Sequence, residues 1–180
     1  MKLFFKEDRD FLLPEDQHTL DEITLNGFFP FYLQKNTIGK DNKHFLSHII
    51  VGRVEYRKEN DNGINSKYAD FFIKILDQFC NKNKIKYKNI LRYSLNLAFY
   101  DGAEKSGIHV DHDVPHKQLI IYLNDPMDPE SYTVLLNKKE DKILKKITPE
   151  KFKGVCFNQC PHYMVYPKRG HRIIAIATFN

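Results

Sequence analysis

Short strands separated by turn residues fill the second half of this 180-residue sequence, and this pattern limits the fold more than any other feature. Every second position from Leu91 to Phe99 is leucine or aromatic, as expected for a strand with two unlike faces. Further short apolar segments follow at residues 119–123, 131–136, 155–158, 163–166 and 173–179. Such a succession is typical of a small antiparallel sandwich or barrel.

The first half of the sequence predicts elements that support this β-rich region. Pro14 suits the first turn of a helix over residues 14–25. Aromatic and aliphatic side chains recur at helical spacing over residues 66–80, with Ser66 as a candidate N-cap. Residues 28–33 and 48–57 predict extended segments. We therefore expect one domain, with helical and strand support in residues 1–90 and a β core in residues 91–180.

Composition indicates a globular protein of the cytoplasm. No apolar run approaches the roughly 20 residues that span a bilayer, and the first residues lack the apolar segment of a signal peptide. Three cysteines are too few for a disulfide scaffold, so we expect reduced thiols. The net charge of +5 comes largely from lysine runs, which we interpret as solvated surface.

The segment Gly107–Asn124 carries the first candidate for chemistry. His109 and Asp111 are two residues apart, and side chains at that spacing point to the same side of an extended strand. An imidazole and a carboxylate would then offer two metal-ligating atoms in one direction. The sequence predicts a metal site that begins with this pair.

A third ligand is expected from a later strand, where His162 and His171 both qualify. Arg172 favours His162, because it follows ten residues later (172 − 162 = 10), across a hairpin turned by residues 167–170. Its guanidinium could capture a carboxylate in the same barrel mouth. Two histidines and one carboxylate leave open coordination positions, the arrangement of non-haem Fe(II) oxygenases, whereas structural zinc requires four protein ligands.

Other residues offer competing metal sites. His112 and Asp113 offer another place where a His-x-carboxylate motif could begin, but no carboxylate lies two positions after His112. His112 and His116 have helical zinc spacing, yet Pro115 between them opposes a helix. We interpret both histidines as loop residues at the mouth of the site. Cys156 and Cys160 lack zinc-ribbon spacing, and core thiols are the preferred interpretation.

Together, His109-Val-Asp111, His162 and Arg172 resemble the motif of the 2-oxoglutarate- and Fe(II)-dependent dioxygenases. The strand that follows reads Tyr122-Leu123-Asn124, which is similar to the prolyl 4-hydroxylase-like branch. The resemblance covers roughly residues 91–180. It implies a mainly β fold with supporting helices, the double-stranded β-helix, a jelly roll related to cupins. Small size and a Lys/Asn-rich composition are similar to phage-encoded members, which would place the protein in a host cytoplasm.

The resemblance also implies a role for each residue of the motif. His109, Asp111 and His162 resemble the iron ligands. Arg172 resembles the arginine that pairs with the distal carboxylate of 2-oxoglutarate, with Tyr122 donating its hydroxyl to the same group. Tyr100 resembles the tyrosine near the metal-proximal end of that cosubstrate, although the intervening loop is one residue shorter. The implied cofactors are Fe(II), 2-oxoglutarate and O₂, with ascorbate as a candidate reductant.

The expected activity is hydroxylation of a peptidyl side chain such as proline, with a peptide, protein or small molecule as substrate and no membrane partner. Two alternatives stay open. One is demethylation of nucleic-acid bases by the same chemistry, which the basic charge suggests; the segment before His109 lacks the clustered arginine and aromatic residues of a nucleotide lid. The other is a non-catalytic cupin-like module that binds a metal or small molecule.

Overall fold

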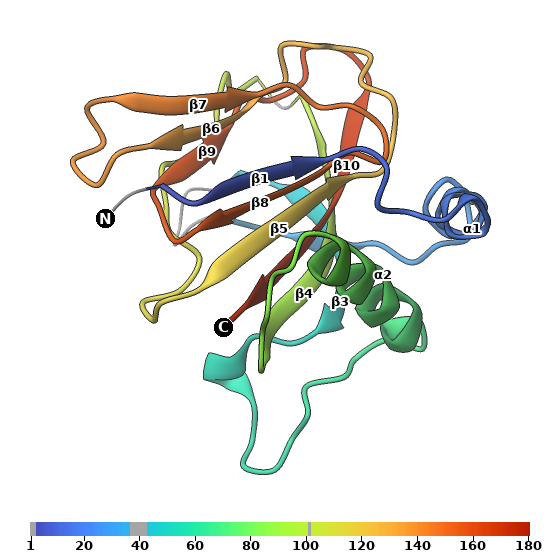
Figure 1. Ribbon diagram of the computed structural model, residues 1–180. Helices are drawn as coiled ribbons and strands as arrows, with labels where there is room; N and C mark the ends of the chain where they lie inside the picture. The colour runs from blue at the N-terminus through green and yellow to red at the C-terminus, as the bar shows by residue number, and fades with distance from the viewer. Residues whose placement is uncertain (1–2, 37–42, 101) are drawn as a thin grey trace.

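The computed structural model describes residues 3–36, 43–100 and 102–180, and shows two antiparallel sheets facing each other (Figure 1). The larger sheet has the strand order β1-β8-β5-β10-β4-β3-β2, and the smaller has the order β7-β6-β9. Two opposed antiparallel sheets with crossing connections form the predicted double-stranded β-helix. The mainly β fold class is therefore confirmed.

The strands are short in both halves of the chain. In chain order they are β1 (Phe5–Asp8), β2 (Tyr32–Gln34), β3 (Phe45–Val51), β4 (Ile90–Phe99), β5 (Lys117–Tyr122), β6 (Thr133–Leu136), β7 (Ile143–Ile147), β8 (Gly154–Asn158), β9 (His162–Met164) and β10 (His171–Phe179). The helices are α1 (Pro14–Thr24), α2 (Ala69–Lys82) and the 3₁₀ turn η1 (Val54–Tyr56).

Alternation along the central strands separates two apolar clusters. On β5, Leu119 and Ile121 belong to a cluster on the outer face of the large sheet, whereas Ile120 and Tyr122 belong to one between the sheets. This division follows from the two-residue period of a strand, which sends neighbouring side chains to opposite faces. The inner face is therefore the one that can carry a site.

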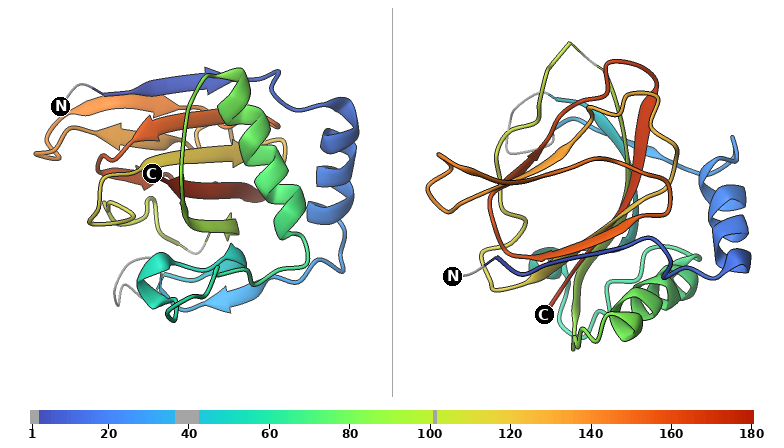
Figure 2. Two further views of the ribbon diagram at one scale, coloured as in Figure 1. Left: turned by 60° about the horizontal axis from the view of Figure 1, so that its bottom comes forward. Right: turned by 45° about the horizontal axis from the view of Figure 1, so that its top comes forward.

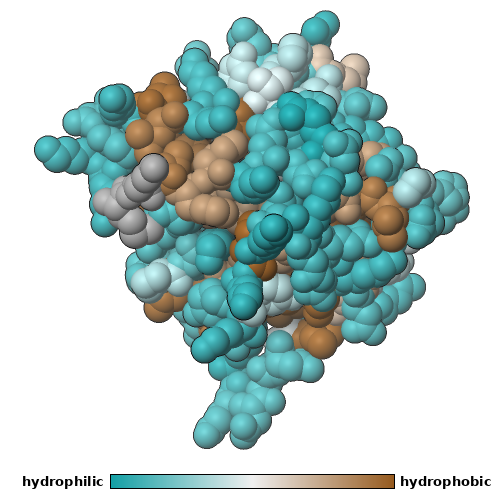
Figure 3. Space-filling view, in the orientation of Figure 1, coloured by the Kyte–Doolittle hydropathy of each residue, from teal (hydrophilic) through white to brown (hydrophobic). Residues whose placement is uncertain are grey.

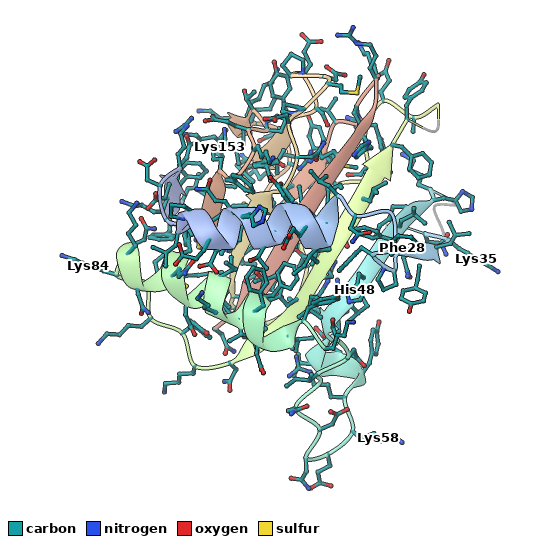
Figure 4. All side chains as sticks on the ribbon, turned by 90° about the vertical axis from the view of Figure 1, so that its right-hand side faces the viewer. Phe28, Lys35, His48, Lys58, Lys84 and Lys153 are labelled. Carbon is teal, nitrogen blue, oxygen red and sulfur yellow. The ribbon has the colours of Figure 1, made fainter. Side chains whose placement is uncertain are left out.

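The outer face is covered by helices. Buried residues of α2 recur three or four positions apart, at Phe72, Ile75, Leu76 and Phe79, and they join the outer cluster. Figure 2 shows α2 lying across the large sheet, and Figure 4 shows α1 beside it. Lys74 and Gln78 of α2 bind the buried Asp16 carboxylate of α1 through contacts of 2.7 and 2.6 Å. These contacts fix one helix on the other.

Several predicted elements differ from those observed. The apolar segments predicted from the sequence do not include β7, whose mostly exposed side chains give no apolar period. His109 and Asp111 were expected on a strand; His109 instead makes an isolated bridge in an extended segment. The predicted strand over 48–57 ends at Val51. From the first 90 residues, β1, β2 and β3 all pair into the large sheet, so this half contributes strands as well as cover.

The surface is largely polar, with scattered apolar patches on the face drawn in Figure 3. No helix in the described part of the chain is both long and apolar enough to cross a membrane. The three cysteines, Cys80, Cys156 and Cys160, are buried and free.

Gly154 is a point where the outer cluster leaves no room for a side chain. A Cβ atom built there would lie 2.7 Å from Phe79 Cε2 and 2.8 Å from Phe11 Cε1. We expect Gly154→Ala to lower the free energy of unfolding by about 1–3 kcal/mol, because rings in a packed core must shift. Gly27→Ala is the control, since nothing lies within 4 Å of its Cβ position. Urea denaturation measures both; equal stabilities would contradict the packing described here.

Candidate functional site

A cavity of about 130 Å³ opens between the two sheets. This is close to the roughly 150 Å³ of engineered cavities that admit benzene, so a small organic group fits. Its walls come from both sheets and from the loops at one end. The lining includes Arg53, Arg92, Asn96, Ala98, His109, Asp111, Gln118, Ile120, Thr133, His162, Tyr163, Met164, Arg172, Ile174 and Ile176.

The backbone brings His109 and His162 together. The amide of His109 donates to the His162 carbonyl over 3.0 Å, and the amide of His162 donates to the His109 carbonyl over 2.9 Å. This reciprocal pair is one rung of an antiparallel ladder. It holds the two imidazole rings with their centroids 4.3 Å apart. The predicted choice of His162 agrees with this placement, whereas His171 begins β10 with an exposed side chain.

Backbone carbonyls orient both imidazoles. His162 Nδ1 lies 3.0 Å from the Cys160 carbonyl oxygen, and His109 Nδ1 lies 3.2 Å from that of Gly107. A carbonyl only accepts, so each Nδ1 carries the proton and each Nε2 keeps its lone pair. Burial lowers the pKa of His162 to about 4. Both features prepare His162 to act as a neutral metal ligand.

Asp111 is buried between the imidazoles and two arginines. Its side chain is 4% exposed, and Arg92 Nη1 donates to Oδ1 over 3.1 Å. Burial alone would raise the pKa of this carboxyl, but Arg92, the two histidines and Arg53 hold it well below its usual range. Asp111 is therefore ionised at neutral pH. Its Oδ2 has no hydrogen-bond partner among the described residues and lies 3.7 Å from His162 Nε2.

These three side chains fit a metal ion. The candidate ligand atoms of His109, Asp111 and His162 all lie within 4.8 Å of one another. A buried carboxylate oxygen without a partner is costly unless a cation or donor completes it, and Oδ2 is such an atom. Two imidazoles and one carboxylate leave coordination positions open, as in non-haem iron centres.

Arg172 lies in the wall of the same cavity, near the start of β10 and at the opposite end of the cavity from Asp111. It is buried, and its Nη2 donates to Thr133 Oγ1 over 2.6 Å while Nη1 donates to the Ser131 carbonyl over 3.0 Å. Its Nε has no partner in the described part of the chain. The guanidinium carbon lies 5.2 Å from the ring centre of Tyr122, a cation–π distance. A fixed, desolvated cation of this kind suits an anionic group in the cavity.

The other predicted residues differ in burial and in their relation to the cavity. Tyr122 is fully buried, and its hydroxyl is 2.9 Å from Thr133 Oγ1, so it joins the Arg172 network. Tyr100 is 53% exposed and is not among the cavity-lining residues. His112 was expected in a loop at the mouth; it is buried, between Glu55 and Thr178. His116 is also buried and bonds the Val114 carbonyl.

Sequence reasoning missed several polar residues of the cavity, among them Arg53, Arg92, Gln118 and Thr133. Arg92 and Gln118 occupy the inner phase of β4 and β5, and Thr133 begins β6. The strand alternation contained the signal for Arg92, because Arg92, Ser94 and Asn96 occupy the phase opposite to Leu91 and Tyr93. Arg53 follows β3 in a segment without periodicity, so no local pattern indicates that it reaches the cavity.

The sequence matches no family model, and no curated protein matches it. Solved structures do. An oxidoreductase of the 2OG-Fe(II) oxygenase family from Burkholderia pseudomallei is similar with a TM-score of 0.76 and 12% identity, covering 99% of this chain and 84% of that one.

Two prolyl hydroxylases are also similar. The enzyme from Trichoplax adhaerens, in complex with a hypoxia inducible factor oxygen degradation domain peptide fragment, has a TM-score of 0.67 and 16% identity, covering 97% of this chain and 82% of that one. The prolyl-4-hydroxylase of Pseudomonas putida has a TM-score of 0.61 and 14% identity, covering 98% and 91%. At these identities the likeness establishes that the chain shares the fold of these enzymes.

The buried imidazole of His162 gives a pH-dependent stability. Its pKa is about 4 in the folded protein, against an ordinary value of 6.5, so between these values the unfolded chain binds more protons. Stability should fall as pH falls through this window, by about 1 kcal/mol at pH 5.5 from this group. Urea denaturation of the metal-free protein at pH 7.5 and 5.5 measures the change.

His162→Gln should show a smaller loss over the same pH interval, whereas His18→Gln, a change in an exposed side chain, should leave it unaltered. Equal pH dependence in wild type and His162→Gln would contradict the neutral, buried state of this imidazole.

Proposed function

We propose that this protein is a 2-oxoglutarate- and Fe(II)-dependent dioxygenase. The observation that carries the proposal is the convergence of His109, Asp111 and His162 in one cavity. That cavity also holds the buried guanidinium of Arg172. The fold shared with 2OG-Fe(II) oxygenases and prolyl hydroxylases supports it.

In this proposal the three side chains are the iron ligands. His109 and His162 bind through Nε2, because their Nδ1 atoms donate to carbonyls. Asp111 binds through Oδ2, because Arg92 occupies Oδ1. Arg92 thereby keeps the carboxylate a one-oxygen ligand and leaves other positions open. Bound iron would supply oxidative decarboxylation of 2-oxoglutarate to succinate and carbon dioxide, coupled to hydroxylation of a C–H bond.

Arg172 and Tyr122 are proposed to bind the distal carboxylate of 2-oxoglutarate. Arg172 Nε is a buried donor without a partner among the described residues, and the Tyr122 hydroxyl shares Thr133 Oγ1 with Arg172 Nη2. Between Arg172 and the metal ligands the cavity wall is apolar, at Ile120, Ile174 and Ile176. These side chains exclude water from the reacting atoms. The proposed set leaves out Tyr100, because its side chain is more than half exposed.

The proposed substrate is a peptidyl side chain, with proline as the first candidate. The Trichoplax adhaerens prolyl hydroxylase, whose fold this chain shares, was solved with a peptide fragment. Ascorbate is the proposed reductant for restoring Fe(II) after unproductive cycles. Neither the nucleic-acid demethylase nor the non-catalytic binding module gains a supporting observation in the described residues.

Conversion of 2-oxoglutarate to succinate tests the activity. Uncoupled turnover with added Fe(II) and ascorbate should be measurable in wild type and absent in His109→Ala, because one ligand is lost. Lys84→Ala, an exposed surface change, is the control and should keep full turnover. Absence of turnover in the iron-loaded wild type would refute the proposed chemistry and favour the binding module.

Replacement of Arg172 tests the cosubstrate assignment. Arg172→Lys keeps the charge but loses Nε and the planar fork, so we expect KM for 2-oxoglutarate to rise ten-fold or more. Manganese(II) affinity, measured by electron paramagnetic resonance, should stay within about three-fold, because no metal ligand changes. An unchanged KM would contradict the role given to Arg172.

A further inference from the structure

The walls of the cavity carry more positive than negative charge. Three guanidiniums line it, from Arg53, Arg92 and Arg172, and Asp111 is the one carboxylate among its described lining residues. The side chains therefore hold an excess of two positive charges, 3 − 1 = 2. Ferrous iron and the 2-oxoglutarate dianion have opposite and equal charges, so they leave this excess unchanged. An additional anion would be attracted to such a site.

The three arginines lie at two ends of the cavity. Strand register pairs Arg172 of β10 with Ala98 of β4, and Thr178 with Arg92. Residues 172 and 178 are six apart on β10, roughly 20 Å at about 3.3 Å per residue. Arg172 therefore serves the cosubstrate end. Arg53 and Arg92 lie at the other end, where both approach Asp111.

Arg92 is engaged by its neighbours. Its Nη1 donates to Asp111 Oδ1 over 3.1 Å, and its Nη2 donates to Ser94 Oγ over 3.0 Å. Its side chain is only 12% exposed. These contacts make Arg92 a residue that positions Asp111, with little capacity left to bind another molecule.

Arg53 retains more of its donors. Nη1 donates to the Asp111 carbonyl over 2.7 Å, whereas Nη2 lies 3.6 Å from Asp111 Oδ1, beyond hydrogen-bond distance. Its side chain is 31% exposed, so it meets both the cavity and solvent. Glu55, two residues later, binds His112 Nδ1 and is not among the lining residues. The guanidinium is thus anchored at one nitrogen, with donors left to bind a carboxylate.

We propose that Arg53 binds a carboxylate of the substrate, and that the substrate is a peptide with an acidic residue flanking the side chain that is hydroxylated. This inference rests on the proposed dioxygenase function and names its substrate class. The guanidinium of Arg53 would hold the peptide next to the open coordination positions. The cosubstrate would bind at the opposite end of the cavity, where Arg172 lies.

Selection from a random dodecapeptide display library tests the proposal without assuming a target residue. The bait is the full chain loaded with manganese(II) and 2-oxoglutarate, which binds without turnover. Wild type should enrich Asp and Glu at least two-fold over the input library. Arg53→Gln should return them to the input level. Lys58→Gln is the matched control: it removes a positive charge from the same segment, but Lys58 lies out on an exposed loop (Figure 4), and enrichment should persist.

The selected peptides allow a double-mutant cycle. Replacing the enriched Glu with Gln should weaken binding to wild type about ten-fold and to Arg53→Gln less than two-fold, since coupled partners are not additive. Manganese(II) affinity of Arg53→Gln should stay within about three-fold of wild type, which separates substrate binding from support of Asp111.

Three outcomes would overturn the inference: no acidic enrichment in wild type, enrichment that persists in Arg53→Gln, or loss of manganese(II) binding in that variant. A parallel arm compares free amino acids with their amides; preference for the free acids that depends on Arg53, without peptide enrichment, would replace the peptide with a small acid. Succinate formation by wild type is measured separately, so failure of this inference is distinguishable from failure of the dioxygenase proposal.

Discussion

The site depends on one reciprocal pair of backbone hydrogen bonds, between His109 and His162. This rung joins residues 53 positions apart, 162 − 109 = 53, and sets the separation of their imidazoles before any side-chain interaction contributes. Backbone geometry is stiffer than a side-chain contact, because each hydrogen bond fixes main-chain atoms within an antiparallel pair. Asp111, the third candidate ligand, follows two residues after His109, at a bend. A metal ion bound by these side chains would meet a largely preorganised site.

A buried carboxylate must be compensated, and the protein does this at one of the two oxygens of Asp111. Arg92 donates to one oxygen of Asp111, and the other oxygen faces the imidazoles with no partner in the part of the chain that the structure describes. An ion pair of this burial is weak support for stability. The Arg92–Asp111 ion pair instead orients the carboxylate, because an Asp111 held at Oδ1 can offer only Oδ2 to a metal ion. Arg172 is also oriented by hydrogen bonds, at the other end of the cavity. Two of its nitrogens donate to Thr133 Oγ1 and to the Ser131 carbonyl.

The sequence predicted the fold class and the grouping of His109, Asp111 and His162, because those predictions used strand periodicity and motif spacing. Alternation from Leu91 to Phe99 matches β4, and the grouping of His109, Asp111 and His162 agrees with the observed cluster. Residues placed by long-range packing gave no local signal. Arg53 reaches the site from a loop, and β7 is a strand of mostly exposed side chains stabilised by its partner β6. The buried position of His112 depends on Glu55 and Thr178, which are 57 and 66 residues away.

The pairing of β1 with β8 joins Phe5 to Phe157. Until residue 157 has left the ribosome, the first strand has no partner and the edge that it covers does not exist. An uncovered strand edge can pair with another chain, and nascent chains are exposed to this hazard during synthesis. The order of translation therefore leaves residues 5–8 without their partner strand until about 150 further residues have been synthesised.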